Sequence, residues 1–317
     1  MRGWRAEASR IKGMLCLVML TAAILLGLHL TRQAQAPHRP VMGIVSTSAE
    51  DDRRDAQAAA LVQAAEQDGF DVLSMPAERT QDAQIEAIRA LIVYRADVIV
   101  FTPLVESGWN NVVREAHAAG IPLLAVDKSM QQEIEGQKSR YVGYDYSALA
   151  AQATDALLRQ GQSRQGVIEL YGTLNSYDAK EIARGCRETL DRAGKTITYS
   201  LCGDGMRSRG YEIMESLQIH LDETGYVICH NDAMALGALD YLEEHGRVPG
   251  QDIALCAIGG GEEAYRAFED GRIQVLVRLD DQALAANTVL AAREAMDAPQ
   301  EHLVHLAQGQ VMEKENG

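Results

Sequence analysis

Short apolar runs recur along the chain, and stretches with helical periodicity separate them. In the stretches 57–68, 82–93 and 109–119, apolar residues recur near the 3.6-residue period of an amphipathic helix. Strands that alternate with helices form parallel sheets that are covered by helices on both faces. Two such sets, at about 41–142 and 143–279, predict an α/β fold with two doubly wound parallel-sheet lobes. The predicted strands are 41–46, 71–74, 98–102, 122–126, 166–171, 197–201, 225–229, 253–258 and 273–278.

The first 40 residues differ from the rest in charge and hydropathy. They hold six Lys and Arg residues and one acid, whereas the full chain has 30 Lys and Arg against 45 Asp and Glu. An apolar stretch at 14–30 follows the basic residues, which is typical of a membrane-targeting segment. Its length lies between that of a cleavable signal and that of a membrane span. Ala34–Ala36 has the small-x-small form of a cleavage site, but Pro37 follows it, so we favour an uncleaved signal-anchor helix over a cleaved signal peptide.

Either alternative places the body of the protein outside the cytoplasm, and an anchor would tether it to the cytoplasmic membrane. The net charge of −15 disfavours a nucleic-acid groove, which needs clustered positive charge. No nucleophile–base–acid set stands out, and only His302 and His305 have the spacing of metal ligands. We therefore expect a monomeric small-molecule-binding protein, not an enzyme, with no cofactor, no catalytic residue and no metal. The other histidines, His230 among them, are expected at the surface.

Four cysteines follow the N-terminal segment, an even number in a compartment that permits disulfides. They are Cys186, Cys202, Cys229 and Cys256. We favour four small buried apolar side chains over bridges. If bridges form, Cys186 with Cys202 is the natural local pair, and Cys229 with Cys256 would remain.

Several motifs occur in the order found in a known family. They read TPLVESGW at 102–109, AGIPLLAVDKS at 119–129, ELYGT at 169–173, HNDAMALGA at 230–238 and PGQDI at 249–253. With these motifs the chain resembles the ribose and galactofuranose branch of the type I periplasmic binding proteins, from about Val41 to its C-terminus. The resemblance implies two lobes joined by a three-strand hinge, with a solute bound between them by hinge closure.

The resemblance also implies where the chain crosses between lobes. The crossings are expected near 141–144 and near Leu279, with a helix at 280–296 returning to the first lobe and the tail after Glu301 returning to the second. The first lobe would then comprise 41–142 plus 280–300, and the second lobe 143–279 plus 301–317. Residues 1–40 would precede both.

Four ligand-binding residues are carried over from the matching motifs. The resemblance implies that Asp127 accepts hydrogens from sugar hydroxyls and that Lys128, in place of an Arg, donates to sugar oxygens without the bidentate fork. Asn231 would bind one hydroxyl through its amide. Asp232 is expected either beside Asn231 at the ligand or as the N-cap of the next helix.

Other candidate positions depart from the family pattern. Arg53 and Gly205 stand where aromatic rings cover the two faces of the sugar, Gly259 replaces an Asp, and Arg278 replaces a Gln or Glu. Together with Arg54 and Lys128, these arginines suggest an altered, more anionic ligand, the alternative being side chains that are solvated or paired with acids. Trp109 is expected either to stack on a sugar or to pack in the core.

The resemblance implies an extracytoplasmic solute-binding protein that presents a small carbohydrate-like ligand to an ABC-type permease. The alternative is a membrane-anchored sensing subunit that signals to a sensor kinase or chemoreceptor. A sugar-responsive repressor that shares this core is disfavoured, because the first 40 residues form no helix-turn-helix.

Overall fold

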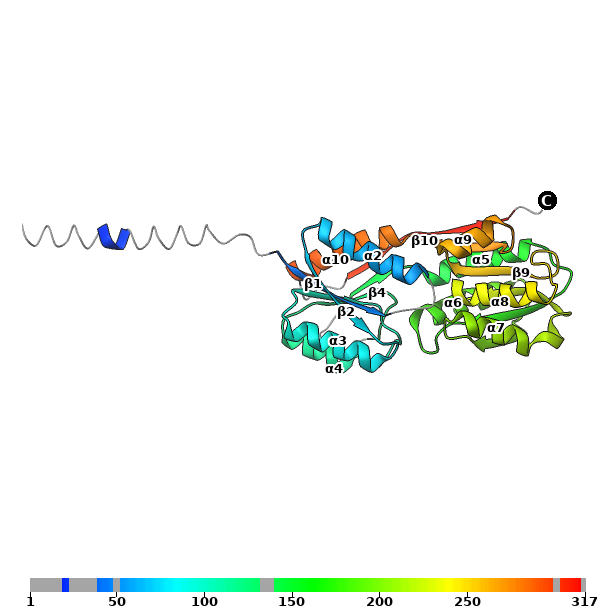
Figure 1. Ribbon diagram of the computed structural model, residues 1–317, viewed down its shortest axis with the longest axis horizontal. Coiled ribbons are helices and arrows are strands. Elements are labelled where there is room, and N and C mark those ends of the chain that lie inside the picture. Colours follow the sequence, from blue (N-terminus) through cyan, green and yellow to red (C-terminus); the bar gives the residue numbers. More distant parts are fainter. Residues whose placement is uncertain (1–18, 23–38, 48–51, 132–139, 299–302, 315–317) are drawn as a thin grey trace, which may run out of the picture. The chain divides into compact units, whose positions relative to one another are not determined.

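The computed structural model describes residues 19–22, 39–47, 52–131, 140–298 and 303–314 (Figure 1). The chain divides into two units, Met1–Arg39 and Pro40–Gly317. In the first, residues 19–22 are helical. Among the described residues, no helix has both the length and the apolar character that crossing a membrane requires. Most of the apolar segment at 14–30 lies outside the described residues, so the signal peptide and the anchor both stay predictions.

The second unit contains two six-stranded sheets. The strands of the first sheet are β1 (Val41–Thr47), β2 (Asp71–Ala77), β3 (Val98–Phe101), β4 (Leu123–Asp127), β5 (Arg140–Gly143) and β11 (Leu303–Leu306). Their order is β11-β5-β4-β3-β1-β2, and all neighbours are parallel. Every residue of β3 and β4 is buried, as expected for central parallel strands covered on both faces.

Helices cover both faces of the first sheet. They are α2 (Asp52–Gln67), α3 (Gln81–Val93), α4 (Asn110–Ala118) and α10 (Asp281–Asp297). Side chains alternate along β1, so Met42 and Ile44 pack with α2 and α10 while Val45 packs with α3 and α4. Helices α2 and α10 lie side by side although five of the six strands of the second sheet lie between them in sequence (Figure 1).

The second sheet has a similar arrangement. Its strands are β6 (Gly166–Tyr171), β7 (Tyr199–Cys202), β8 (Thr224–Cys229), β9 (Ala254–Gly259), β10 (Val275–Leu279) and β12 (Gly309–Glu313), in the order β12-β10-β9-β8-β6-β7. The edge strand β12 is antiparallel to β10, so this sheet is mixed where parallel strands alone were predicted. An edge strand can reverse because its chain enters by a short connection and not by a helical crossover.

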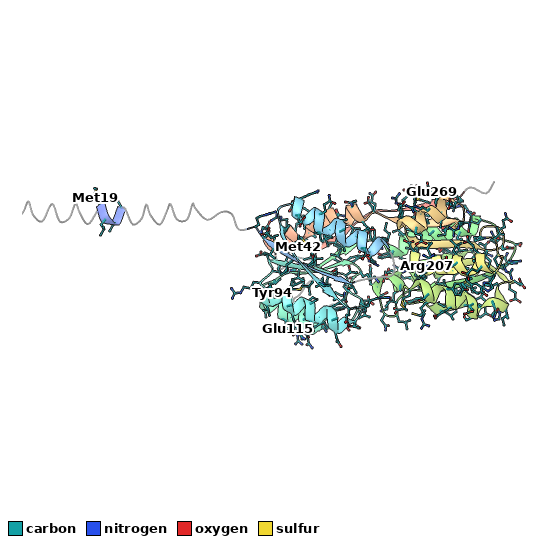
Figure 2. All side chains as sticks on the ribbon, viewed as in Figure 1. Met19, Met42, Tyr94, Glu115, Arg207 and Glu269 are labelled. Carbon is teal, nitrogen blue, oxygen red and sulfur yellow. The ribbon has the colours of Figure 1, made fainter. Side chains whose placement is uncertain are left out.

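Five α-helices and a short 3₁₀ helix lie in the described part of this lobe. They are α5 (Tyr146–Arg159), α6 (Tyr177–Arg192), α7 (Arg207–Ser216), η1 (Gln218–His220), α8 (Asp232–Glu244) and α9 (Glu262–Glu269). Helices α5 and α6 cover one face of the sheet, and α7, α8 and α9 cover the other. Arg207 at the start of α7 joins Asp240 of α8 at 2.8 Å and Glu263 of α9 at 2.7 Å (Figure 2).

The chain passes between the sheets after β5, after β10 and after β11. The last crossing differs from the sequence prediction, which returned the tail to the second lobe from residue 301. Leu303–Leu306 instead pairs with β5, so the return begins only after Leu306. A four-residue strand with alternating exposure carries too weak a local signal to reveal which sheet edge it joins.

All four cysteines of the second lobe are free, so neither of the bridges considered from the sequence is formed. Cys186, Cys229 and Cys256 are buried, and Cys202 is partly buried. Burial raises the pKa of the Cys186 thiol to about 12. Burial also raises the pKa of Cys229 and of Cys256, so these three buried thiols are neutral at physiological pH and pack as small apolar side chains.

Candidate ligand-binding cleft

A cavity of about 350 Å³ lies at the carboxyl ends of the first-sheet strands. This is the edge of an open α/β sheet where ligands bind, because the connections on either side diverge there. The first lobe lines it with polar side chains that include Thr47, Arg54, Gln57, Arg79, Gln84, Thr102 and Lys128. The second lobe contributes Gly172, Thr173, Asp178, Gly205, His230 and Asn231. A second cavity of about 20 Å³ adjoins it and is lined by Arg53, Arg54, Tyr146, Asp178, His230, Asn231, Asp232, Ile258, Gly259 and Leu279.

Asp127 is fully buried at the end of β4 and lies behind the wall of the cleft. Its backbone is left-handed, with φ of 66°, which turns the chain sharply after the strand. One carboxylate oxygen accepts a hydrogen bond from Arg54 and the other accepts one from Tyr146. Burial alone would raise the pKa of Asp127, but Arg54 and Arg53 hold that pKa well below its usual range. The ionised carboxylate fixes Arg54 at the cavity surface, whereas the sequence predicted a direct contact between Asp127 and the ligand.

Arg53 is also held by carboxylates. It lies in the first turn of α2, which begins at Asp52, five residues before the predicted helix. Its guanidinium donates to Asp281 at 2.9 Å and lies 3.7 Å from Asp127. Gln57 and Tyr144 donate to the same Asp281 oxygen, at 2.9 and 3.1 Å. A cation in the first turn of a helix interacts unfavourably with the helix dipole and so destabilises the helix. The carboxylates of Asp281 and Asp127 offset this destabilisation.

Lys128 connects the two lobes. Its Nζ lies 2.9 Å from Oδ2 of Asp178, at the start of α6, and both side chains line the main cavity. Burial raises the pKa of Asp178, but Lys128 reverses the shift and lowers that pKa. Oδ1 of Asp178 is buried and has no hydrogen-bond partner among the described residues. That oxygen is therefore an available acceptor at the boundary between the lobes.

Asn231 caps helix α8, a role that was expected of Asp232 as one of two alternatives. Its Oδ1 accepts from the backbone of Met234 at 3.0 Å, and its Nδ2 donates to the carbonyl of Gly205 at 3.0 Å. Asp232 is the first residue of α8, and its Oδ2 accepts from the backbone N–H of Gly261 at 2.7 Å. A Cβ at Gly259 would overlap that carboxylate. Gly259 is thus required by the position of Asp232.

Besides Asp127, two predicted site residues lie outside the lining of both cavities. Trp109 is fully buried, packs edge-on against Phe101 with ring centroids 5.0 Å apart, and donates from Nε1 to the carbonyl of Val105 at 2.7 Å. It is a core residue at the start of α4, so the alternative of a sugar-stacking Trp is wrong. Arg278 is exposed, and its guanidinium carbon lies 4.7 Å from the centre of the Tyr265 ring. The prediction that Arg278 reaches the ligand is also wrong.

The space beside Gly205 is bordered by polar side chains. A Cβ at Gly205 would lie 3.2 Å from Nδ2 of Asn231 and 3.6 Å from Nη2 of Arg79, so polar groups occupy that place. Arg79 donates to the backbone carbonyl of Asp204, across the cleft. Hydrogen-bonding groups therefore stand where the family pattern has an aromatic ring, in line with the departure expected at Gly205.

Sequence reasoning missed several residues of this region. His230 was expected at the surface but is buried and lines both cavities, with its Nε2 3.1 Å from Glu169. It directly precedes the Asn-Asp pair and opens the HNDAMALGA motif, and Glu169 opens the ELYGT motif. Both residues therefore lie within motifs that carry the family resemblance. Gln57, Tyr144, Tyr146, Asp178 and Asp281 were missed as well. Each acts through contacts between segments far apart in sequence, for which the local pattern holds no signal.

The two lobes touch along the rim of the cleft. Lys180 of α6 donates to Glu106, and the backbone N–H of Glu106 donates to the carbonyl of Asn175 at 2.8 Å. These contacts, with those of Lys128 and Arg79, join the two lobes across the cleft. Within the described ranges, no group of three or more His, Cys, Asp or Glu residues is placed to hold a metal ion.

The sequence and the fold are similar to those of known proteins. The model of the periplasmic binding protein domain matches residues 42–300. The chain belongs to the periplasmic binding protein family. This periplasmic binding protein is 30% identical over 244 residues to the galactofuranose-binding protein YtfQ of Escherichia coli K12, a match that covers 75% of this chain and 76% of that protein.

Solved structures agree with this assignment. The arabinose-transporter binding protein of Shewanella sp. ANA-3, bound to α- and β-L-arabinofuranose, is 26% identical with a TM-score of 0.79. A Mycobacterium smegmatis protein in complex with β-D-fucofuranose is 25% identical with a TM-score of 0.80. Both matches cover 86% of this chain and 91% of the other. The protein is therefore a type I periplasmic binding protein of the ribose and galactofuranose branch.

Proposed function

We propose that this periplasmic binding protein captures a small neutral sugar between its lobes and presents it to an ABC-type permease outside the cytoplasm. The observation that carries the proposal is the pairing of charges in the cleft. Arg54 is bound to Asp127, Arg53 to Asp281 and Lys128 to Asp178. An ion pair whose partners neutralise each other still offers donors and acceptors to hydroxyl groups. A neutral polyol matches this lining better than an anion, which would have to displace carboxylates from buried cations.

The names of the relatives support a furanose-type ligand. YtfQ is named as galactofuranose-binding, and the two structural relatives hold arabinofuranose and fucofuranose. A cavity of about 350 Å³ is within the range of small-molecule sites. The same relatives support transport over sensing, since one is the binding component of an arabinose transporter. We further propose that the segment at 14–30 directs the body of the protein outside the cytoplasm, as a cleaved signal or as an anchor.

A thermal-shift screen of the purified protein tests the ligand class. The neutral set is D-galactose, D-ribose, L-arabinose and D-fucose, and the anionic set is galacturonate and ribose 5-phosphate. A ligand at 100 times its Kd stabilises the native state by about 2.7 kcal/mol, which raises Tm measurably. We expect a rise with at least one neutral sugar and none with the anions. A rise confined to anions would overturn the neutral-ligand proposal, and no rise with any sugar would overturn sugar binding.

A further inference from the structure

His230 lies where the two cavities meet. It follows the last residue of β8, its side chain is 1% exposed, and it lines both the main cavity and the smaller one. Its ring packs against Tyr171, with ring centroids 4.9 Å apart. A histidine held so firmly at a ligand cavity has a fixed direction for each ring nitrogen.

Glu169 determines which nitrogen carries the hydrogen. This carboxylate is fully buried on β6 and lies 3.1 Å from Nε2 of His230. It also accepts hydrogen bonds from Arg187, at 2.7 Å, and from Ser200. Burial opposes ionisation, but His230, Ser200 and Arg187 lower the pKa of Glu169 to about 2. An ionised carboxylate only accepts, so the hydrogen between the two groups resides on Nε2.

Nδ1 is the ring nitrogen that Glu169 does not contact. It is buried and has no hydrogen-bond partner among the described residues. In the neutral ring with hydrogen on Nε2, Nδ1 presents a lone pair. Buried polar atoms nearly always have a partner, because an unsatisfied one costs about 1–3 kcal/mol. Nδ1 lies beside Gly172, which also lines the main cavity, because a Cβ at that glycine would be 3.9 Å from Nδ1.

We propose that Nδ1 of His230 is a ligand-binding atom that accepts a hydrogen bond from a sugar hydroxyl, with Glu169 as the positioning residue. This inference rests on the proposed sugar-binding function and adds a contact to it. It also sets a requirement on the sugar, which must offer a hydroxyl hydrogen at the junction of the two cavities. A deoxy sugar that lacks this hydroxyl would leave Nδ1 unsatisfied.

Two substitutions separate the two ring nitrogens. The amide of His230→Gln reaches the position of Nε2 and keeps a donor for Glu169, but leaves no polar atom at the position of Nδ1. The shorter His230→Asn keeps a polar atom near Nδ1 and loses the bond to Glu169. His220→Gln is the matched control, because His220 contacts Tyr199 at 3.0 Å and lies outside the lining of both cavities.

Titration calorimetry with D-galactose, D-ribose and L-arabinose tests the proposal. We expect the sugar that binds to wild type to bind about tenfold more weakly to His230→Gln. The loss of affinity should be smaller in His230→Asn than in His230→Gln. The affinity of His220→Gln should equal that of wild type. In ¹⁵N-histidine-labelled wild type, the same sugar should shift an Nδ1 resonance that is missing from His230→Gln. A merely structural role would not produce that shift.

The outcomes distinguish this inference from the function on which it rests. Equal affinity of wild type and His230→Gln, without an Nδ1 shift in wild type, would overturn the role of His230 and leave sugar binding intact. Failure of wild type to bind any of the three sugars would overturn both. If His230→Gln does not fold, the presence or absence of the Nδ1 shift in wild type decides the question.

Discussion

Strain and charge are concentrated at single residues around the cleft. A left-handed non-glycine backbone such as that of Asp127 costs on the order of 1–3 kcal/mol and persists only where surrounding contacts enforce it. Here the enforcing contacts are Arg54 and Tyr146, and the result is an arginine held at the cavity wall. We therefore expect Asp127 to act on a ligand through Arg54. Removing a single partner in such a network leaves a buried charge uncompensated.

Lys128→Met provides a residue-scale test of ligand binding. The change removes a cavity-lining ammonium and leaves Asp178 without its cation. Because hydrogen bonds to charged groups contribute about 1.5–3 kcal/mol, we expect sugar affinity to fall at least tenfold in titration calorimetry. Lys195→Met is the control, since Lys195 lies outside the cleft lining, and its affinity should match wild type. An unchanged sugar affinity in Lys128→Met would show that Lys128 is not a ligand-binding residue.

Glu169→Gln provides a pH test. The folded pKa of about 2 lies below the ordinary value of 4.5, so this carboxylate stabilises the fold above pH 4.5 and loses that contribution as pH falls toward 2. By pH 3 wild type should have lost about 2 kcal/mol through this group, and Glu169→Gln should not. Urea unfolding at pH 7 and pH 3 measures the difference. Equal losses in both proteins would show that Glu169 is not tightly bound in the native state.

Helices α7 and α8 approach closely where a glycine of each helix faces the backbone of the other. Gly237 of α8 lies against the backbone of Arg207, and Gly210 of α7 lies against the backbone of Met234, so a Cβ at either position would overlap a carbonyl oxygen. Close approach of α7 and α8 positions the start of α8, where Asn231 and Asp232 face the cleft. Helix packing thereby sets the position of two site residues.

Gly237→Ala should force α7 and α8 apart. Although alanine favours a helix by up to about 1 kcal/mol, overpacking against backbone costs about 1–3 kcal/mol or more, and we expect a net loss of stability. Urea unfolding against Glu188→Ala, an exposed change on α6, measures the effect. The displaced start of α8 should also weaken sugar binding. A stability equal to that of wild type would mean that the helices can separate without cost.

At the scale of the molecule, contacts at the rim hold the lobes together across the cleft. Lys180 and Glu106 belong to different lobes and lie outside the lining of both cavities. Solvent-accessible ion pairs of this kind contribute about 0.2–1 kcal/mol. A ligand can close the lobes only through contacts that differ between the open and closed forms. Rim contacts of this size shift the equilibrium between the open and closed forms without determining which form predominates.

Lys180→Met should therefore open the ligand-free protein. We expect a larger radius of gyration by small-angle scattering without sugar, a return to the wild-type value with saturating sugar, and a loss of affinity of no more than about fivefold. Arg272→Met, which breaks the 2.7 Å pair with Glu243 inside the second lobe, should change neither quantity. Identical scattering of Lys180→Met and wild type without sugar would contradict a role of this pair in closure.

The sequence by itself determined the order and extent of most strands and helices, because the hydrophobic period is a local property of the chain. It also placed Lys128 and Asn231 at the carboxyl ends of strands, where they line the cleft. Only the tertiary structure decided which acidic side chain forms an ion pair with which basic one. Arg53 and Asp281 are 228 residues apart, and a local pattern holds no information about such a pair. The same reason explains the burial of His230, the core position of Trp109 and the sheet edge joined by β11, since each depends on which distant segment packs nearby.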